Sequence, residues 1–154
     1  MYNRSIVPKS FKVPQELKTK DFILRPLKVN DLIKDYEAVM SSIDHLRGRM
    51  DDSDWPVGLT IEENLIDLGW HQREFTLGHS FAYTVVSLDG QDCLGCCYIY
   101  PSENQEVEVE VFYWIRQNLL ETGLEDYLGE VLKQWLKTDW PFERVGFPVR
   151  LIYF

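Results

Sequence analysis

Apolar and polar residues repeat along this chain at spacings that predict short strands and amphipathic helices. The apolar run 22–27 reads as a strand, and Asn30 and Asp31 after it can each cap a helix. Thr60 and Glu63 fit a capping box that opens a second helix. The side chains expected to face inward are Leu32, Tyr36, Val39, Met40 and Ile43 on the first helix, and Ile61, Leu65, Leu68 and Phe75 on the second.

Three strands are predicted after the second helix. Segments 81–88 and 93–100 flank Asp89 and Gly90, a dipeptide that favours a tight hairpin turn. A third strand spans 106–116. Together the three segments predict an antiparallel meander.

The last third of the chain predicts one long helix and one more strand. Thr122 and Glu125 fit a second capping box, and apolar residues then repeat at helical spacing until Pro141 stops the helix. Segment 143–147 reads as a final strand. The order β-α-α-β-β-β-α-β is typical of an α/β (α+β) domain with a central, mostly antiparallel mixed sheet flanked by helices.

Length and composition indicate one folded domain. The chain has 154 residues, and its 14% aromatic content argues against disorder. We therefore expect a polar N-terminal arm at 1–20 and a single domain at 21–154. The net charge of −9 argues against a nucleic-acid partner, because phosphate contacts require clustered Lys and Arg, and it disfavours anionic membranes.

Targeting and metal signals are weak. No apolar run reaches the ~18 residues of a membrane span, and the N-terminus has no apolar signal region, so we expect a cytoplasmic protein. Cys93, Cys96 and Cys97 are expected in the core, with Cys93 and Cys97 on one strand face, and we expect no metal site. The histidines, expected at the surface, are His45, His71 and His79.

Several motifs in this order resemble the GNAT family of N-acetyltransferases. The run FILRPL at 22–27 with Asp31 is similar to the family's opening LxLRPL…D. Segment 81–101 resembles its central hairpin, with the small Gly95 midway along the second strand. The sequence EVFYWIR at 110–116 is similar to the family's fourth strand. The resemblance covers about 22–148 and implies the GNAT acyl-CoA N-acyltransferase fold.

The resemblance also implies a function and a coenzyme site. It implies transfer of an acetyl group from acetyl-CoA to an amine of a small molecule or peptide. Backbone groups of the fourth strand would hold the pantetheine arm, and the turn after it would hold the pyrophosphate. The residues implied are Trp114, Ile115 and Arg116 on the strand, and Thr122, Gly123 and Leu124 in the turn.

The same turn departs from the family pattern. The family has Q/R-x-x-G-x-G/A, whereas this chain has Leu120 at the first position and Glu125 at the last, and it keeps only the central Gly123. The chain also ends soon after the fifth strand of the family. The alternative is therefore a non-catalytic GNAT-fold module that binds a ligand or oligomerises, with an apolar flank that a second copy would cover in a homodimer.

Carboxylates on the third strand of the meander are candidate proton acceptors. Glu106, Glu108 and Glu110 alternate with valines, so they share one face of the predicted strand. By the resemblance Glu110 is the best match for the general base, with Glu108 beside it, and Tyr153 would protonate the departing thiolate. The competing interpretation is a solvated polar face.

Acceptor binding is expected between the first two helices. Asp54 and Trp55 lie in this segment, and an acidic plus an aromatic residue suit a cationic amine. The competing interpretation is a solvated loop.

Overall fold

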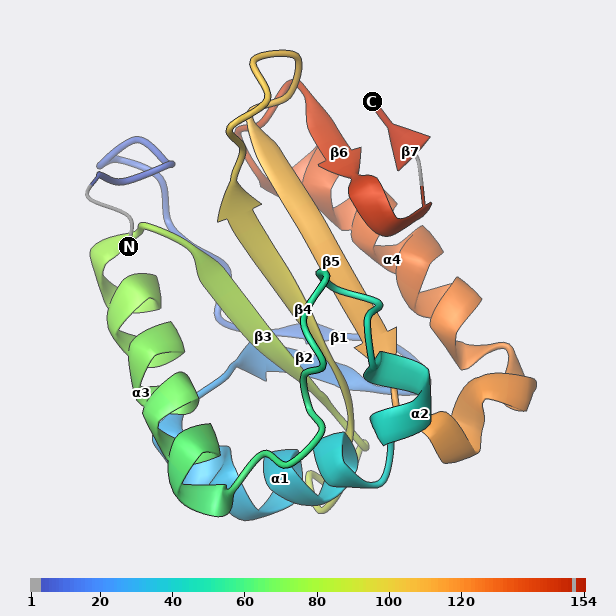
Figure 1. The fold of residues 1–154 in the computed structure, drawn as a ribbon. Coiled ribbons are helices and arrows are strands. Elements are labelled where there is room, and N and C mark those ends of the chain that lie inside the picture. The colour runs from blue at the N-terminus through green and yellow to red at the C-terminus, as the bar shows by residue number, and fades with distance from the viewer. Residues whose placement is uncertain (1–3, 151) are drawn as a thin grey trace.

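The computed structural model describes residues 4–150, the backbone of 152 and 153, and residue 154. The strands are β1 (Leu17–Lys18), β2 (Ile23–Pro26), β3 (Phe81–Val86), β4 (Cys93–Pro101), β5 (Val109–Ile115), β6 (Val145–Phe147) and β7 (Ile152–Tyr153). The helices are α1 (Leu32–Met40), α2 (Ile43–Leu46), α3 (Ile61–Leu77) and α4 (Leu124–Asp139), with 3-10 turns η1 (Val29–Asp31), η2 (Gln117–Thr122) and η3 (Pro148–Arg150). Helices α1 and α3 lie on one side of the sheet and α4 on the other (Figure 1). No helix of the described residues has the length and apolar character that crossing a bilayer requires.

Within the described residues, seven strands pair in sequence order, and every pair is antiparallel except β5 with β6. That parallel pair is short, because only Val109 with Val145 and Glu110 with Gly146 are in register. Beyond Glu110, β5 continues to Ile115 while β6 ends, so the two strands separate. This separation opens the middle of the sheet on the side where α4 begins.

Most predicted elements are confirmed. Gly90, with φ 75°, forms the turn of the β3–β4 hairpin, and Thr60 and Glu63 close the capping box of α3. Gly95 lies where β4 approaches β5 so closely that a Cβ there would overlap the carbonyl oxygen of Trp114. A glycine at this position is therefore required by the packing of the two strands.

The strand predicted at 106–116 is shorter than expected. β5 begins at Val109, and Glu108 lies just before it with its carboxylate accepting the backbone N–H groups of Glu143 (3.0 Å) and Arg144 (3.3 Å). These bonds turn Glu108 toward the start of β6. The prediction that three carboxylates share one strand face is therefore wrong, and only Glu110 lies within the strand.

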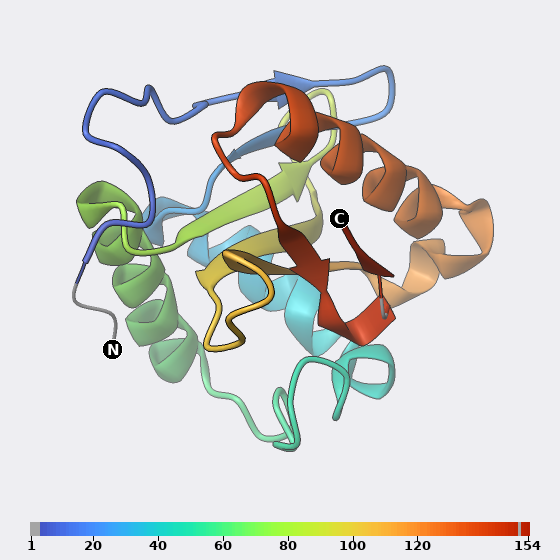
Figure 2. The same cartoon turned by 90° about the horizontal axis from the view of Figure 1, so that it is seen from above.

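Two hydrophobic clusters pack on the two faces of the sheet. One contains Leu128, Leu132 and Trp135 of α4, and the N-terminal segment packs on it. In that segment the Phe11 ring lies 5.4 Å from the Trp140 ring, and Tyr83 donates its hydroxyl to the Pro14 carbonyl at 2.6 Å. The predicted arm is thus packed against the core, and Figure 2 shows it running along the top edge of the sheet.

The cysteines lie in the core as predicted, but their faces differ from the prediction. Cys97 packs in the α4-side cluster, whereas Cys93 and Cys96 pack together on the α1 and α3 side. The cause is a shift in the β3–β4 register, where Val86 pairs with Cys93 while Leu94 is passed over. One extra residue in a strand moves the side chains after it to the opposite face.

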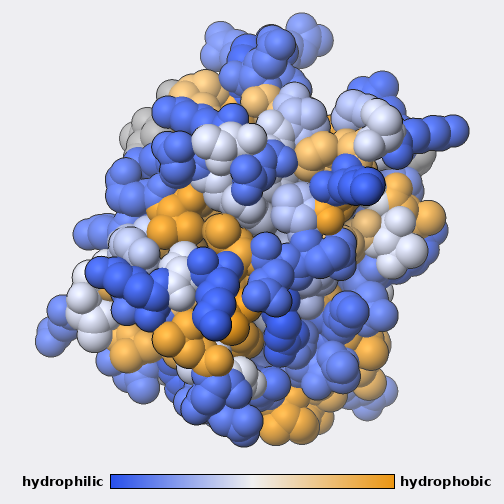
Figure 3. Space-filling view, turned by 180° about the vertical axis from the view of Figure 1, so that it is seen from behind, coloured by the Kyte–Doolittle hydropathy of each residue, from blue (hydrophilic) through white to orange (hydrophobic). Residues whose placement is uncertain are grey.

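The face seen from behind is mostly hydrophilic (Figure 3). Apolar residues emerge on this face as patches among hydrophilic ones (Figure 3). Ile33 of α1 and Ile66 of α3 are 70% and 65% exposed. A homodimer that covers such residues stays a prediction.

Candidate active site

The carboxylate of Glu125 holds together the region where β5 and β6 separate. One oxygen accepts the backbone N–H of Ile115 at 3.1 Å and lies 2.9 Å from His45 Nε2. The other oxygen accepts hydrogen bonds from Arg49 and Arg150, both at 3.0 Å. Four separate elements therefore meet at one side chain that is 15% exposed. The network places two guanidinium groups and one imidazole beside the edge of β5.

Arg150 spans the gap between the separated strands. It lies in η3, directly after β6, and its guanidinium carbon is 3.8 Å from the centre of the Tyr113 ring on β5. This cation–π contact and the bond to Glu125 fix the guanidinium across the opening. The Arg150 guanidinium therefore lies between Tyr113 of β5 and Glu125 of α4 in this structure.

The turn before α4 does not form the predicted capping box. Thr122 donates to the Leu119 carbonyl at 2.6 Å and accepts the Leu124 N–H at 3.2 Å, while Gly123, with φ 81°, is the N-cap residue. The N-cap residue Gly123 offers no capping side chain, the Thr122 hydroxyl binds only the first helical N–H, and Glu125 reaches to β5 instead of back to the turn. Uncapped N–H groups at a helix start are suited to phosphate oxygens.

The residues at the end of β5 that the resemblance implies for coenzyme binding already have hydrogen-bond partners within the protein. The Ile115 N–H is bound to Glu125, and the Arg116 N–H donates to the Leu94 carbonyl at 2.8 Å. The Arg116 side chain forms a two-pronged ion pair with Glu37 (2.7 and 2.6 Å), which lowers the pKa of Glu37. Trp114 is fully buried.

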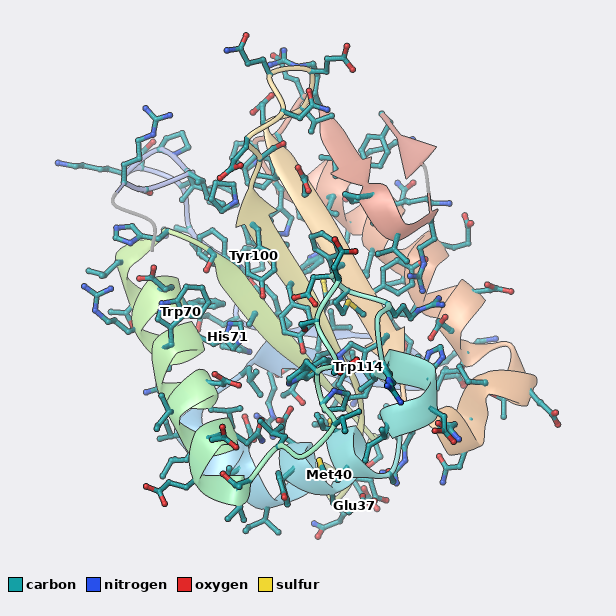
Figure 4. The ribbon with its side chains drawn as sticks, viewed as in Figure 1. Glu37, Met40, Trp70, His71, Tyr100 and Trp114 are labelled. Atoms are coloured by element: carbon teal, nitrogen blue, oxygen red, sulfur yellow. The ribbon has the colours of Figure 1, made fainter. Side chains whose placement is uncertain are left out.

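A cavity of about 270 Å³, called the α3 cavity below, lies between α3 and the β4–β5 face of the sheet. Figure 4 shows Trp70 and His71 on α3 and Tyr100 on β4 at this place. Three carboxylates also line it, from Asp35, Asp51 and Asp67. The cavity is therefore both aromatic and acidic.

The candidate base Glu110 lies on the same side of the sheet as this cavity. It pairs in register with Tyr100 and shares its strand face with Phe112, and both of these line the cavity. Its half-buried carboxylate accepts the Ser102 hydroxyl at 2.8 Å. The other candidate, Glu108, is turned away toward β6.

The predicted acceptor residues are separated by the structure. Trp55 lines the α3 cavity, whereas Asp54 is largely exposed and pairs with Arg47 at 3.4 Å. Asp51 of the same loop lies at the cavity instead. The side chain of Tyr153 lies outside the described residues, and only its backbone in β7 is placed.

Two groups that line the cavity have pKa values shifted by burial. Burial raises the pKa of Asp35, although hydrogen bonds from Asn64 (2.9 Å) and Cys96 (3.5 Å) oppose the shift. Burial lowers the pKa of His71 to about 4, so its imidazole is neutral near pH 7. Shifted groups that line a cavity are characteristic of functional sites.

Sequence reasoning missed most of these residues. The inward face predicted for α3 included Ile61 and Leu65, which are 43% and 41% exposed, whereas the buried Asn64 was not predicted. His71 was expected at the surface but stacks on Tyr98. Polar residues of α3 face inward because they line a cavity rather than a dry core. The sequence signal that could have revealed them is their helical spacing around Leu68. The side chain of Leu68 is buried and also lines the cavity.

The other two histidines are also less exposed than predicted. His45 binds Glu125 and its side chain is 10% exposed, and His79 lies 3.2 Å from Glu74 with 14% of its side chain exposed. Glu125 lies 80 positions from His45, so spacing along the chain does not reveal that contact, whereas Glu74 is only 5 positions from His79.

Comparison with known proteins gives the fold its name. No protein-family model matches the chain, and no curated protein sequence is similar to it. Among solved structures it resembles ribosomal-protein-S5-alanine acetyltransferase from Vibrio fischeri (TM-score 0.67, 15% identity, 84% of this chain and 71% of that chain). It also resembles RimL, a ribosomal L7/L12 alpha-N-protein acetyltransferase (0.64, 14%, 90% and 74%). A third is microcin C7 self-immunity acetyltransferase MccE in complex with acetyl-CoA and AMP (0.65, 10%, 86% and 72%). The chain therefore has the GNAT acyl-CoA N-acyltransferase fold, as predicted.

Proposed function

We propose that this protein is an N-acetyltransferase that moves an acetyl group from acetyl-CoA to an amine of a small molecule or peptide. The observation that carries the proposal is the separation of β5 from β6 next to the α3 cavity. The strand gap offers backbone groups to a thioester donor, and the cavity offers room for an acceptor. The fold supports it, since the similar structures named above are acetyltransferases, one of them in complex with acetyl-CoA.

Groups of this chain suited to hold the coenzyme surround Glu125. The uncapped start of α4 and the guanidinium groups of Arg49 and Arg150 are suited to its phosphates. The Ile115 N–H is suited to polarise a carbonyl, but it is bound to Glu125 in this structure. Coenzyme binding therefore requires the Glu125 carboxylate to give up these partners.

The acceptor amine must lose its proton before it can attack. Glu110, oriented by the Ser102 hydroxyl, would take that proton directly or through water. The amine nitrogen would then bond to the thioester carbonyl carbon and release its second proton to water, while the carbon–sulfur bond breaks and its electron pair leaves with the sulfur. Tyr153 would protonate the departing thiolate. Glu108 has no part in these steps, because it binds backbone N–H groups.

The second candidate is a non-catalytic module with the same fold. The observation that favours it is again Glu125, whose negative charge lies where the phosphates and carbonyl of a coenzyme would compete with it. In that case the bonds of Glu125 are permanent and the site binds no acetyl-CoA. The cytoplasmic location and the homodimer belong to both candidates as predictions.

Calorimetric titration of the purified protein with acetyl-CoA separates the two candidates. Micromolar binding, with N-acetylated product formed from a panel of amines, supports the enzyme. Failure to bind at millimolar coenzyme supports the module and contradicts the enzyme.

A further inference from the structure

The α3 cavity has a continuous aromatic wall. The His71 ring lies 5.4 Å from the Tyr98 ring at 28°, and Tyr98 lies 5.9 Å from Tyr100 at 5°. Phe112 continues the wall 5.9 Å beyond Tyr100, and Trp55 closes it from the loop before α3. The faces of such rings attract cations, most strongly where water is excluded.

The carboxylates of the cavity have no cationic partner within the described part of the chain. Asp35 is 3% exposed, and Asp67 is half-buried with a pKa raised by burial, yet neither forms an ion pair. Other acids on this chain are paired, for example the buried Asp31 with Arg25 at 2.8 Å. Carboxylates that burial leaves without a counter-charge gain stability when a cation enters.

The other lining groups add no positive charge. Among the described residues that line the cavity, none is Lys or Arg. The imidazole of His71 is neutral near pH 7, and its Nδ1 is buried without a hydrogen-bond partner. The field inside the cavity is therefore set by its carboxylates and the faces of its rings.

We propose that the α3 cavity binds a small organic monocation, an alkylamine that carries an aromatic ring, with Asp35 and Asp67 opposing its ammonium group. A volume of about 270 Å³ holds on the order of nine water molecules, which is the size of about nine non-hydrogen atoms. The use of this cation as the acetyl acceptor rests on the proposed function, whereas the binding of the cation is independent of it.

Three ligands of similar size and different charge test the proposal: 2-phenylethylamine, 2-phenylethanol and phenylacetate. Titration calorimetry of the full chain at pH 7 measures each affinity, and quenching of the tryptophan fluorescence, since Trp55 and Trp70 line the cavity, reports on the place of binding. The amine should bind about tenfold more tightly than the alcohol, and phenylacetate should bind more weakly still.

Variants locate the binding. Asp67→Asn should weaken amine binding about fivefold to tenfold and leave the alcohol unaffected, because it removes charge and keeps shape. Asp35→Asn is the second variant, checked for folding by circular dichroism. Asp89→Asn, in the exposed β3–β4 turn, is the matched control and should bind like the wild type. Equal affinity for amine and alcohol, no binding of the amine, or unchanged binding in both cavity variants overturns the proposal.

The same experiment keeps this proposal apart from the catalytic one. Amine binding without any acetylated product supports the cation site and counts against acetyl transfer to this amine. Acetylation of other amines without binding of 2-phenylethylamine overturns the cation site and leaves the acetyltransferase standing.

Discussion

The side chain of Glu125 is bonded to the backbone N–H of Ile115 at 3.1 Å, so the first turn of α4 is tied to the edge of β5. Two arginines, Arg49 and Arg150, share this carboxylate near the separated strands. Any anionic ligand that enters here competes with Glu125 for them. The state of this one carboxylate thus decides between the two proposed functions.

Glu125→Gln should strengthen acetyl-CoA binding by about tenfold, because it removes a negative charge beside the arginines. Titration calorimetry measures the change. Glu121→Gln, which removes an exposed charge from the preceding turn, is the control and should alter the affinity little. Weaker binding in Glu125→Gln would mean that the carboxylate organises the site rather than competing for it.

Glu110→Gln should lower kcat about a hundredfold or more while acetyl-CoA affinity is unchanged, because the amide cannot accept the amine proton. Steady-state kinetics and calorimetry give the two quantities. Glu108→Gln is the matched variant two residues away. It should retain activity and lose stability, since its carboxylate holds the N–H groups of Glu143 and Arg144.

Glu110 and Glu125 show which features of the site the sequence could predict and which it could not. The role of Glu110 rests on a local motif within one strand and stays a prediction, whereas another local signal, the Thr60 capping box, is confirmed by the structure. The partners of Glu125 could not be predicted, because Arg49 and His45 are 76 and 80 positions away. The α3 cavity was missed for the same reason, since it forms only when distant segments pack.

Acid should destabilise the protein through His71. Its pKa is about 4 when folded and ~6.5 when unfolded, so below pH 6.5 the unfolded chain binds a proton that the folded chain excludes. The contribution of neutral His71 to the free energy of unfolding is fully present above pH 6.5 and is lost as the pH falls toward 4. Asp35 and Asp67, whose pKa values are raised, act in the opposite direction.

His71→Phe isolates the histidine term, because it keeps an aromatic ring and removes the titration. Urea unfolding at several pH values should show the wild type losing up to ~1.4 kcal/mol per pH unit relative to this variant between pH 6.5 and 4. Parallel curves for the two proteins would mean that His71 titrates normally.

Gly129 of α4 packs directly against Tyr113 of β5. A Cβ at Gly129 would overlap the tyrosine hydroxyl and lie 3.0 Å from its Cζ. Gly129→Ala should therefore cost about 1–3 kcal/mol of unfolding free energy, measured in urea. Adding Tyr113→Phe removes the overlapping oxygen and should recover part of the loss. If the double variant loses as much unfolding free energy as the two single variants together, the result would contradict this contact.

Acetyl transfer itself is the most direct test of the proposed function. The purified protein is mixed with acetyl-CoA and 2-phenylethylamine or other amines, and N-acetylated product and free coenzyme A are measured by mass spectrometry. We expect both products in equal amounts, and their loss in Glu110→Gln. The absence of product with every amine, together with no binding of acetyl-CoA at millimolar concentration, would contradict the proposed function.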